Sequence, residues 1–565
     1  MTRGADSPAT EAAASLLDAL VVLGVRHVVV SPGSRSQALA LAAQELERQG
    51  RIALHVRIDE RDAGFTALGI GREARVPAVV ICTSGTAVAN LLPAALEAHH
   101  AGVPMLLLTA DRPPELRGVG ANQTTDQTRI LLPAARFFAE ARTPEGGADE
   151  AEEARDLAVR AFVAAAAGSV QGVAQLNLPY REPLAGPLPG WFADGGRGAD
   201  DLAERARGLV EEASDPVILE QGPRTIVVAG ADAGPDAEVL AHQGGWPLVA
   251  EIVSGSRYGR RVVRGYREAL RHDALGGAVE RVVVLGHPTL SRETTALLSR
   301  TDVEVIAARG AGEDLDLSGR TRAADQIAVA PGEPDRAWLG AWMEWSAAHA
   351  ADLETAAPDL AGLQSADPRE RLGAVRAELA AVRRKLDREQ LVAGVWRATW
   401  PHDRLLFGSS RLVRVADEVL GGKKVPVHAN RGLAGIDGTI ATGVGIALAS
   451  QREGEPGVTR VLLGDLALLH DAGGLLLPPG ELRPRIQVVV GNDGGGTIFD
   501  GLEVAQTASP QAMDRVQYTP HEVDVASLAA AYGWEHVRAT TRAELDQALT
   551  TAITGPQIVE VPLDR

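Results

Sequence analysis

The chain has 565 residues, of which 45% are hydrophobic and 4% aromatic, so it is long enough for several globular domains. Its net charge of −18 and pI near 5.3 disfavour a nucleic-acid partner or an anionic membrane surface. Because it has one cysteine, no signal-peptide pattern and no apolar stretch of about twenty residues, we expect no disulfide framework, no membrane insertion and a cytoplasmic location.

Arginine supplies nearly all of the positive charge. Three lysines among 56 basic residues leave 53 arginines. A guanidinium binds a carboxylate through two parallel N–H groups, so a bound carboxylate should meet such planar forks. The cysteine, Cys82, lies in an apolar run and is expected to be a buried core thiol.

Residues 10–179 alternate between apolar runs of strand length and helical periods, which is typical of a βα repeat. A linker over 180–223 holds one short helix, 201–213. A second repeat precedes a long connection, 310–388, in which a Trp338-Trp342-Trp345 stripe indicates the packing face of a helix. A third repeat starts near residue 389. Strands are expected at 27–30, 54–58, 78–82, 105–108, 173–178, 225–229, 247–252, 281–285, 303–307, 404–407, 425–428, 460–463, 485–490 and 557–561.

These patterns predict an α/β protein with three doubly wound parallel-sheet domains, at residues 1–185, 186–388 and 389–565. In such sheets, ligands bind at the carboxyl ends of the strands. Polar groups follow three predicted strands of the first domain and should meet at one edge. These groups lie at residues 31–36, 59–61 and 109–114. The central domain offers a single polar cluster of this kind, at 287–292.

Two predicted strands of the third domain end at Gly464-Asp465 and at Gly491-Asn492. A spacing of 27 residues leaves room for a helix and a return loop, so Asp465 and Asn492 should lie at one edge. Carboxylate, amide and carbonyl oxygens suit Mg²⁺, which commonly shares its coordination with phosphate. The neighbouring glycines and a helix that begins near Leu466 favour a bound diphosphate. Alternatively, the two residues only cap helices or turns.

A magnesium diphosphate site alone would suit a kinase, a synthetase or a thiamine enzyme. The sequence has no G-x-x-x-x-G-K-[ST] run, which disfavours a nucleotide. Thiamine chemistry needs a carboxyl group against the aminopyrimidine ring, where it promotes removal of the thiazolium C2 proton. Glu60, between the predicted strand at 54–58 and a helix over 61–72, is the candidate. Alternatively, Glu60 is an ordinary first-turn acid that interacts with the helix dipole.

Several motifs resemble known enzymes. Gly464-Asp465-Leu466, followed by Asn492-Asp493 and glycines, resembles the signature of thiamine-dependent decarboxylases and carboligases, although its general form is GDG and NN. Five segments of the first and third domains resemble the 2-succinyl-5-enolpyruvyl-6-hydroxy-3-cyclohexene-1-carboxylate synthase family of menaquinone biosynthesis. They are SPGSRSQALALAA (31–43), IDERDAGFTALGIG (58–71), TSGTAVANLLPA (83–94), LLLTADRPPELRGVGANQT (106–124) and NRGLAGIDG (430–438).

The resemblance implies a pyrimidine-binding first domain, a central domain and a diphosphate-binding third domain. It implies thiamine diphosphate and Mg²⁺ or Mn²⁺ as cofactors. The implied reaction, a transferase reaction of the transketolase type, decarboxylates 2-oxoglutarate and adds the resulting succinyl carbanion to isochorismate. Because family members place the cofactor between the first domain of one subunit and the third domain of another, we expect a homodimer or a dimer of dimers.

The resemblance also assigns roles by motif position. Glu60 is the catalytic carboxyl group, and Asp465, Asn492 and the Gly494 carbonyl are the metal ligands. Further cofactor contacts are assigned to Gly464, Leu466, Ala467, Ile436, Ile498 and Phe499. The isochorismate side is assigned to Ser34, Arg35, Arg112, Asn122, Gln123 and Arg292. The distal carboxylate of 2-oxoglutarate is assigned to Ser410 and Arg414, with Arg431 nearby.

Two departures from the family pattern affect these assignments. Some members have a lysine where Ser291 precedes Arg292, and the glycine run after Asn492 is one residue longer than in shorter versions. Two other hypotheses remain. One is a different thiamine carboligase or decarboxylase, such as an enzyme that resembles acetohydroxyacid synthase. The other is a non-catalytic module that binds a diphosphate.

Overall fold

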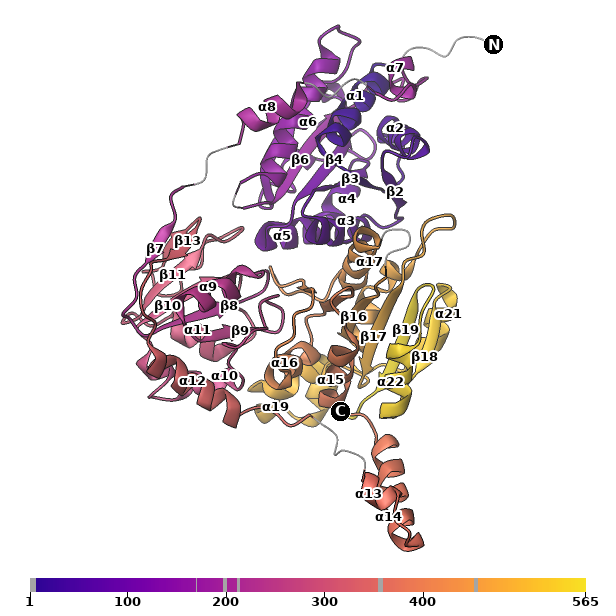
Figure 1. Ribbon diagram of the computed structural model, residues 1–565. Coiled ribbons are helices and arrows are strands. Elements are labelled where there is room, and N and C mark those ends of the chain that lie inside the picture. Colours follow the sequence, from indigo (N-terminus) through magenta and orange to yellow (C-terminus); the bar gives the residue numbers. More distant parts are fainter. Residues whose placement is uncertain (1–6, 169, 197–200, 211–213, 354–358, 452–455) are drawn as a thin grey trace.

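The structure is a computed structural model that describes residues 7–168, 170–196, 201–210, 214–353, 359–451 and 456–565. Figure 1 shows three α/β domains, the first at the top, the central one at the lower left and the third at the lower right. The main sheet of each is parallel throughout. The boundaries proposed at residues 185 and 388 fall between these sheets.

The first domain contains a six-stranded sheet in the order β2-β1-β3-β4-β6-β5. Its strands are β1 (His27–Val30), β2 (Ala53–Val56), β3 (Ala78–Cys82), β4 (Met105–Asp111), β5 (Ala135–Glu140) and β6 (Val173–Pro179). Its main helices are α1 (Pro8–Leu23), α2 (Gln37–Arg48), α3 (Glu60–Ala74), α4 (Thr86–Asn90), α5 (Leu92–Ala101) and α6 (Glu150–Ala166). The Cys82 thiol is free and fully buried, as expected.

The third domain repeats this order as β15-β14-β16-β17-β19-β18. Its strands are β14 (Arg404–Phe407), β15 (Val427–Ala429), β16 (Thr459–Gly464), β17 (Ile486–Asn492), β18 (Glu535–Arg538) and β19 (Gln557–Pro562). Its main helices are α15 (Arg388–Ala398), α16 (Arg411–Val419), α17 (Thr439–Ser450), α18 (Asp465–His470), α21 (Val525–Ala531) and α22 (Arg542–Thr550).

The central sheet has the order β9-β8-β10-β11-β12, and a separate pair is formed by β7 and β13. The strands are β7 (Val217–Leu219), β8 (Thr225–Ala229), β9 (Leu248–Ala250), β10 (Arg281–Leu285), β11 (Glu304–Ala308), β12 (Arg322–Ala324) and β13 (Ile327–Val329). The helices are α9 (Asp236–Gly244), α10 (Tyr266–Arg271), α11 (Arg292–Leu298) and α12 (Arg336–Ala348), and the hairpin of α13 (Leu360–Leu363) and α14 (Pro368–Val382) projects beyond the body in Figure 1.

The predicted strands are all present, with ends that shift by at most three residues. The predicted helix at 201–213 is observed as α8 (Leu202–Gly208), and residues 211–213 lie outside the described part of the chain. On α12, Trp338 and Trp342 are buried and pack edge to face, which confirms the packing face. Among the described residues, no helix is long and apolar enough to cross a lipid bilayer.

Helices α3 and α17 join the first and third domains through glycines. A Cβ atom on Gly69 would lie 2.1 Å from the Thr442 carbonyl oxygen, and one on Gly445 would lie 2.1 Å from the Thr66 carbonyl oxygen. Real Cβ atoms do not approach backbone that closely, so only glycine lets the two helix backbones pack at this separation.

A pair of buried carboxyl groups lies at the same contact. Asp471 accepts hydrogen bonds from the backbone N–H groups of Ile440 and Ala441, at 2.7 and 3.0 Å. Burial raises the pKa of Asp471 to about 7, and the nearby Asp62 adds to the shift. Burial, with the charge of Asp59, raises the pKa of Asp62 to about 6. Two adjacent carboxyl groups share a proton most favourably, so this contact is protonated below neutral pH.

All three domains meet at Arg72 of α3, which is fully buried. Its guanidinium donates to both carboxylate oxygens of Asp232 in the central domain, at 2.6 and 2.7 Å. It also lies 3.7 Å from Glu97, which accepts from the backbone N–H groups of Gly432 and Leu433 in the third domain. These contacts fix the loop that follows β15 against both other domains.

We expect Gly445→Ala to separate α3 from α17 and to lower stability. Overpacking of a close contact costs about 1–3 kcal/mol, which should lower the midpoint of thermal unfolding by several degrees. Gly340→Ala on α12 is the matched control, because a Cβ there meets no atom within 4 Å. The control should be neutral or stabilising. Equal midpoints for the two variants would contradict the close-packing argument.

The Asp62–Asp471 pair should make stability depend on pH. Both pKa values are raised in the folded state, so the stabilisation is complete near pH 4 and is lost as the pH rises through about 7. In Asp62→Asn, the amide can donate to an ionised Asp471, so the loss between pH 5 and 8 should shrink by on the order of 1 kcal/mol. Thermal unfolding of both proteins across this range measures the difference. An unchanged pH slope would contradict the shared proton.

Candidate active site

The carboxyl ends of β16 and β17 bring Asp465 and Asn492 to one edge, as predicted. The two strands pair in parallel, with Gly464 opposite Gly491, so the following residues lie side by side. A Cβ atom on Gly464 would lie 3.9 Å from the Ser410 Cβ, which places the start of α16 beside this edge. Residues from β14, β16 and β17 therefore surround the same point.

Asp465 is buried, and its carboxylate is held in a defined orientation. One oxygen accepts from the Leu466 N–H at 2.7 Å, and the other from the Gly495 N–H at 2.9 Å and from the His521 Nε2 at 3.1 Å. Burial, with the neighbouring Asp493 carboxylate, raises the pKa of Asp465. A cation at this position would favour the ionised form and relieve the cost of burying it.

The other two predicted metal ligands, Asn492 and the Gly494 carbonyl, differ in how their oxygens are placed. Asn492 donates its amide N–H to Glu560 at 2.8 Å, which leaves its carbonyl oxygen for the sheet edge, where it accepts from the Gly494 N–H at 3.2 Å. The Gly494 carbonyl accepts from Arg565 at 2.8 Å, so this guanidinium would have to move before the oxygen could bind a cation. Asp465 and Asn492 thus present oxygens of the kind that Mg²⁺ prefers, with each oxygen also accepting a hydrogen bond, and the Gly494 carbonyl is engaged by the Arg565 guanidinium.

The remaining cofactor candidates surround this edge. Gly464 caps α18, which contains Leu466 and Ala467 in its first turn. A Cβ atom on Gly496 would lie 3.1 Å from Phe499 and 3.3 Å from Leu466, so both side chains border the glycine run. Ile498 lies next to Phe499 in the same 3₁₀ turn (Thr497–Gly501), and half-buried Ile436 packs on the third-domain core before α17.

Glu60 is the first residue of α3, and Asp59 caps the helix by accepting from the Arg61 N–H at 2.8 Å. Burial chiefly raises the pKa of Cys82 at the end of β3, and the charge of Glu60 adds to it, so Glu60 lies near that strand end. Within the described part of the chain, no hydrogen bond or ion pair joins Glu60 to Asp465 or Asn492.

Two predicted arginines of the first domain lie together at the sheet edge. Arg35, in the loop after β1, donates to the Tyr180 carbonyl oxygen at 3.0 Å, and Arg112, after β4, donates to the Ser84 hydroxyl. Arg112 is buried, and burial together with the charge of Arg35 lowers its pKa. Neither guanidinium forms an ion pair with any carboxylate that the structure describes. This first arginine pair therefore presents positive charge that no ion pair neutralises, although the charge of Asp111 acts on Arg112 at longer range.

Residues around this pair are held by Ser84. The Gln123 side chain donates to the Ser84 carbonyl oxygen at 2.9 Å, and the Ser84 hydroxyl donates to the Gln123 carbonyl oxygen at 3.0 Å. Gln123 has φ +55°, in the left-handed region, and this reciprocal contact stabilises that conformation. Ser34 and Asn122 are exposed at the same edge. Sequence reasoning brought these residues together correctly but gave Ser84 no role.

A second arginine pair lies where the third domain meets the central domain. Ser410 caps α16 and accepts from Arg414 through its carbonyl oxygen at 3.0 Å. Buried Arg431, after β15, donates to the Thr289 hydroxyl at 2.7 and 2.9 Å and to the Ser409 hydroxyl at 3.3 Å. Burial lowers the pKa of both arginines. At Arg431 the charge of Glu251 opposes the shift, and the charge of Arg414 adds to it. Among the described residues, neither forms an ion pair with a carboxylate.

Arg292 stands apart from both pairs. It begins α11, is 74% exposed, and lies 3.4 Å from Glu503 of the third domain. Its predicted role at the isochorismate side stays a prediction.

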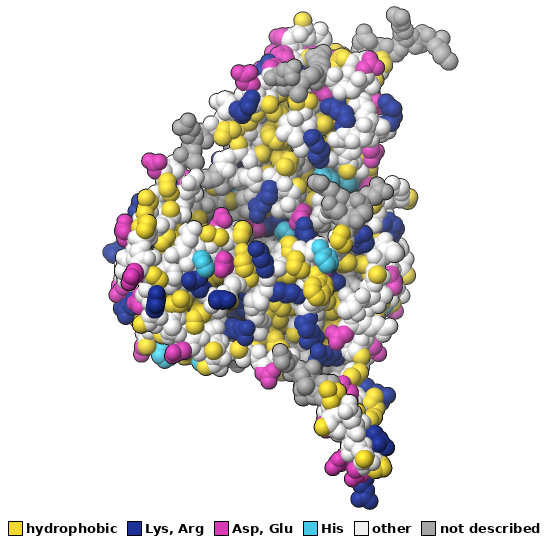
Figure 2. All heavy atoms as spheres, viewed as in Figure 1, with side chains coloured by type: hydrophobic (Ala, Val, Ile, Leu, Met, Phe, Trp, Pro, Cys, Tyr) yellow, Lys and Arg dark blue, Asp and Glu magenta, His cyan; other side chains and the backbone are white. Residues whose placement is uncertain are grey.

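Figure 2 shows basic side chains and histidines gathered where the domains meet.

Sequence reasoning missed three contacting residues. His521 and Glu560 orient the predicted metal ligands, and Thr289 holds Arg431. Each is far from its partner in sequence. His521 and Glu560 follow no local pattern, whereas Thr289 lies in the polar cluster at 287–292, for which no contact with Arg431 was predicted. Only the paired strand ends could have suggested Glu560, because it lies on β19 beside β17.

The comparisons with known proteins agree with this geometry. The solved structure of benzoylformate decarboxylase from Polynucleobacter necessarius matches 98% of both chains with a TM-score of 0.65 at 15% identity, which shows a shared fold. Residues 10–130 match the thiamine pyrophosphate enzyme N-terminal TPP binding domain, and residues 423–561 match the corresponding C-terminal TPP binding domain.

Relatives named 2-succinyl-5-enolpyruvyl-6-hydroxy-3-cyclohexene-1-carboxylate synthase match nearly the full length. Those from Leifsonia xyli subsp. xyli and Clavibacter michiganensis subsp. michiganensis are each 52% identical and cover 99% of this chain and 97% of their own length. One from Kineococcus radiotolerans is 45% identical, with coverage of 98% and 96%. The chain is therefore a thiamine diphosphate-dependent enzyme and belongs to the family of 2-succinyl-5-enolpyruvyl-6-hydroxy-3-cyclohexene-1-carboxylate synthases.

Proposed function

We propose that the two arginine pairs are the carboxylate-binding groups of the family reaction in menaquinone biosynthesis, the decarboxylation of 2-oxoglutarate and the addition of its succinyl carbon unit to isochorismate. The supporting observation is that Arg35, Arg112, Arg414 and Arg431 are at least half-buried and form no ion pair with any described carboxylate. A buried cation without a counter-charge is costly, so each pair is suited to an anionic ligand. Both substrates are dicarboxylates.

The first pair would bind isochorismate. Arg35 and Arg112 would contact a carboxylate, and Gln123 and Asn122 would donate hydrogen bonds at the exposed rim, with Ser34 beside them. The second pair would bind 2-oxoglutarate: Arg414 and Arg431 would hold the distal carboxylate, and Ser410 would lie between that group and the metal edge. With one arginine pair for each substrate, the site would favour dicarboxylates over neutral or monocarboxylate analogues.

When bound, thiamine diphosphate would supply a nucleophilic carbon and an electron sink for the bonding pair that stays behind when CO₂ leaves the substrate. Asp465 and Asn492 would hold Mg²⁺ or Mn²⁺ against the diphosphate, and the Gly494 carbonyl would join them once Arg565 moves away. Glu60 would hydrogen-bond to the pyrimidine ring and pass the proton that the reaction needs. Ile436, Ile498 and Phe499 would contact the apolar parts of the cofactor.

We further propose that the working enzyme is a dimer or a dimer of dimers, in which Glu60 of one subunit completes the site built by Asp465 of another. The support is the family resemblance, in which the cofactor lies between the first domain of one subunit and the third domain of another. Within the described residues of one chain, no hydrogen bond or ion pair joins Glu60 to Asp465 or Asn492. A cytoplasmic location stays a prediction.

We expect Glu60→Gln to lower kcat by about 100-fold or more, because a glutamine cannot transfer the proton. Asp59→Asn, which keeps a capping oxygen at the same helix start, should stay close to the unsubstituted enzyme. The assay follows loss of isochorismate in the presence of 2-oxoglutarate, thiamine diphosphate and Mg²⁺. Full turnover by Glu60→Gln would overturn this role.

The same variant tests the shared site. Mixing Glu60→Gln with Asp465→Ala subunits under exchange conditions should restore about a quarter of the unsubstituted activity, since half of the dimers would then carry one intact site. No recovery, with subunit exchange demonstrated by mass, would place Glu60 and Asp465 of one chain in the same site.

The two arginine pairs should affect different substrates. Arg112→Met should raise KM for isochorismate by about tenfold to 100-fold and leave KM for 2-oxoglutarate nearly unchanged, since one charged hydrogen-bonded contact is lost. Arg414→Met should show the reverse pattern. Steady-state kinetics with each substrate varied in turn provides the measurement. If each variant raised both KM values equally, the assignment of one pair to one substrate would be wrong.

A further inference from the structure

The central domain, which carries none of the predicted metal ligands, holds Arg431 directly. Both Nε and Nη2 of Arg431 donate to the Thr289 hydroxyl, at 2.9 and 2.7 Å, and Nη2 also lies 3.3 Å from the Thr289 carbonyl oxygen. Thr289 lies in the loop that follows β10 and leads to α11. The hydroxyl therefore sets where the guanidinium points without forming an ion pair with it, and the nearest acids, Glu251 among them, act on Arg431 only at longer range.

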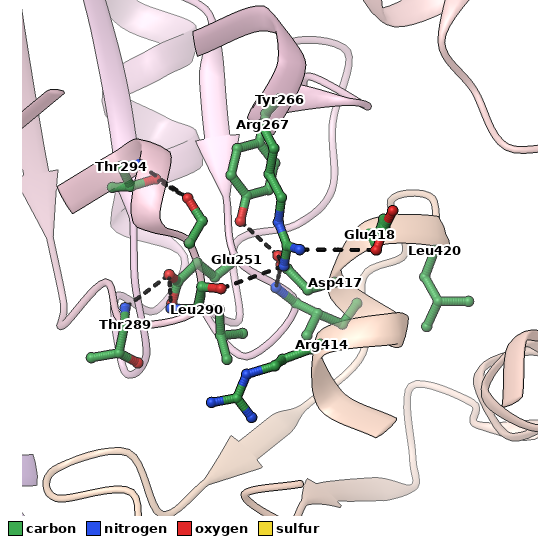
Figure 3. Close-up of polar contacts among 12 residues, drawn as sticks. Glu251, Tyr266, Arg267, Thr289, Leu290, Thr294, Arg414, Asp417, Glu418 and Leu420 are labelled. Carbon is green, nitrogen blue, oxygen red and sulfur yellow. Dashed lines mark hydrogen bonds and ion pairs between the residues drawn. The ribbon is translucent and has the colours of Figure 1, made fainter. Parts of the chain in front are cut away.

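Thr289 is itself held by a buried acid. One carboxyl oxygen of Glu251, at the end of β9, accepts from the backbone N–H groups of Thr289 and Leu290, at 2.8 and 2.6 Å (Figure 3). Glu251 is 1% exposed. Its other oxygen has no hydrogen-bond partner within the described residues. Burial, with the neighbouring Asp417, raises the pKa of Glu251 to about 8, but either protonation state leaves the accepting oxygen in place.

The next residue along the chain holds the helix that carries Arg414. The backbone N–H of Ile252 donates to Asp417 of α16 at 2.8 Å. Asp417 also accepts from Arg257 at 3.0 Å, from the Tyr266 hydroxyl at 2.6 Å and from Arg267 at 2.8 Å, all in the central domain. In Figure 3, the Arg414 side chain extends from α16 toward the side of Thr289 and Leu290.

The two arginines of the second pair are thus anchored to two consecutive residues that directly follow β9 in the central domain. Glu251 fixes Arg431 through Thr289, and Ile252 fixes Arg414 through Asp417 and α16. Because Glu251 and Ile252 are consecutive residues that directly follow β9, the central domain helps to set the separation of the two guanidinium groups.

We propose that Glu251 and Thr289 are positioning residues that set the specificity of the second arginine pair for the distal carboxylate of the dicarboxylate substrate. This proposal rests on the function proposed above for Arg414 and Arg431. The proposal gives the central domain a part in substrate selection. The side chains of that domain need not touch the reacting atoms.

Thr289→Val and Thr289→Ser form the decisive pair of variants. Valine keeps the shape but removes the hydroxyl that accepts from Arg431, so KM for 2-oxoglutarate should rise about tenfold, with KM for isochorismate within about twofold of the unsubstituted value. Serine restores the hydroxyl and should restore KM. An unchanged KM in Thr289→Val, or equal rises for both substrates, would overturn the proposal.

Two substitutions of Glu251 test whether its hydrogen-bond acceptor is needed to position the Thr289 loop. Glu251→Gln retains an oxygen for both backbone N–H groups and should keep KM for 2-oxoglutarate close to the unsubstituted value, whereas Glu251→Leu should raise it selectively. Asp403→Ala is the control. Asp403 is a buried acid that accepts from the backbone N–H groups of Trp400, before β14, and Val458, before β16, and it also pairs with Arg460 at 2.8 Å, at the amino ends of the third-domain strands. This control should lose stability without a selective change in KM.

Binding of a substrate analogue distinguishes a failure of the positioning role from a failure of the function proposed for the second pair. Glutarate, a dicarboxylate without the keto group, should bind to the holoenzyme more weakly in Thr289→Val and in Arg431→Met, as measured by calorimetry. If Arg431→Met left glutarate binding and KM for 2-oxoglutarate unchanged, the function proposed for the second pair would be wrong. If Arg431→Met weakened binding but Thr289→Val did not, the positioning role alone would be wrong.

Discussion

The site depends on partly buried arginines that have no ion-pair partner among the described residues. A guanidinium withdrawn from water needs hydrogen-bond acceptors, and a carboxylate partner would neutralise the charge that a substrate should meet. This protein supplies neutral acceptors instead: the Ser84 hydroxyl for Arg112, the Tyr180 carbonyl for Arg35 and the Thr289 hydroxyl for Arg431. Hydrogen bonds to neutral oxygens orient the cations and leave their attraction for anions intact.

Carboxylates in this region serve the backbone and the domain contacts. Glu97 accepts from two N–H groups of the loop after Arg431, Glu251 accepts from two N–H groups of the Thr289 loop, and Asp417 anchors α16 to the central domain. Acids therefore hold the loops that carry the arginines, without pairing with the arginines of the site. This division explains how a chain with a net charge of −18 can keep positively charged sites for dicarboxylates.

The sequence predicted the sheet interiors well and the sheet edges poorly. Strands such as β3 and β10 are buried along their whole length and read as continuous apolar runs, so their limits could be placed without error. The unpredicted strands are β5, β7, β12, β13 and β18. Of these, β5, β12 and β18 lie at sheet edges, and β7 and β13 form a separate pair. Strands β5 and β18 combine half-buried and exposed residues. A four-residue run such as Glu-His-Val-Arg has no apolar signal of its own, and only pairing with β19 makes it a strand.

The candidate site divides in the same way. Asp465 and Asn492 were predictable because the rule of parallel strand ends converts a position in sequence into a position in space. The anchors of the site were not. Thr289 and Arg431 are 142 residues apart, and His521 and Asp465 are 56 residues apart. Contacts of this kind depend on how domains and loops dock, which no local pattern records.

The first and third sheets share one strand order, and α3 and α17 follow the corresponding strands, β2 and β15. The contact between the two domains is therefore made by equivalent helices, each of which offers a glycine to a carbonyl oxygen of the other. Such an arrangement has local pseudo-twofold symmetry within a single chain, like the isologous interface of a dimer. Any change to this helix pair acts on both halves of the site at once, so the two domains are constrained to vary together.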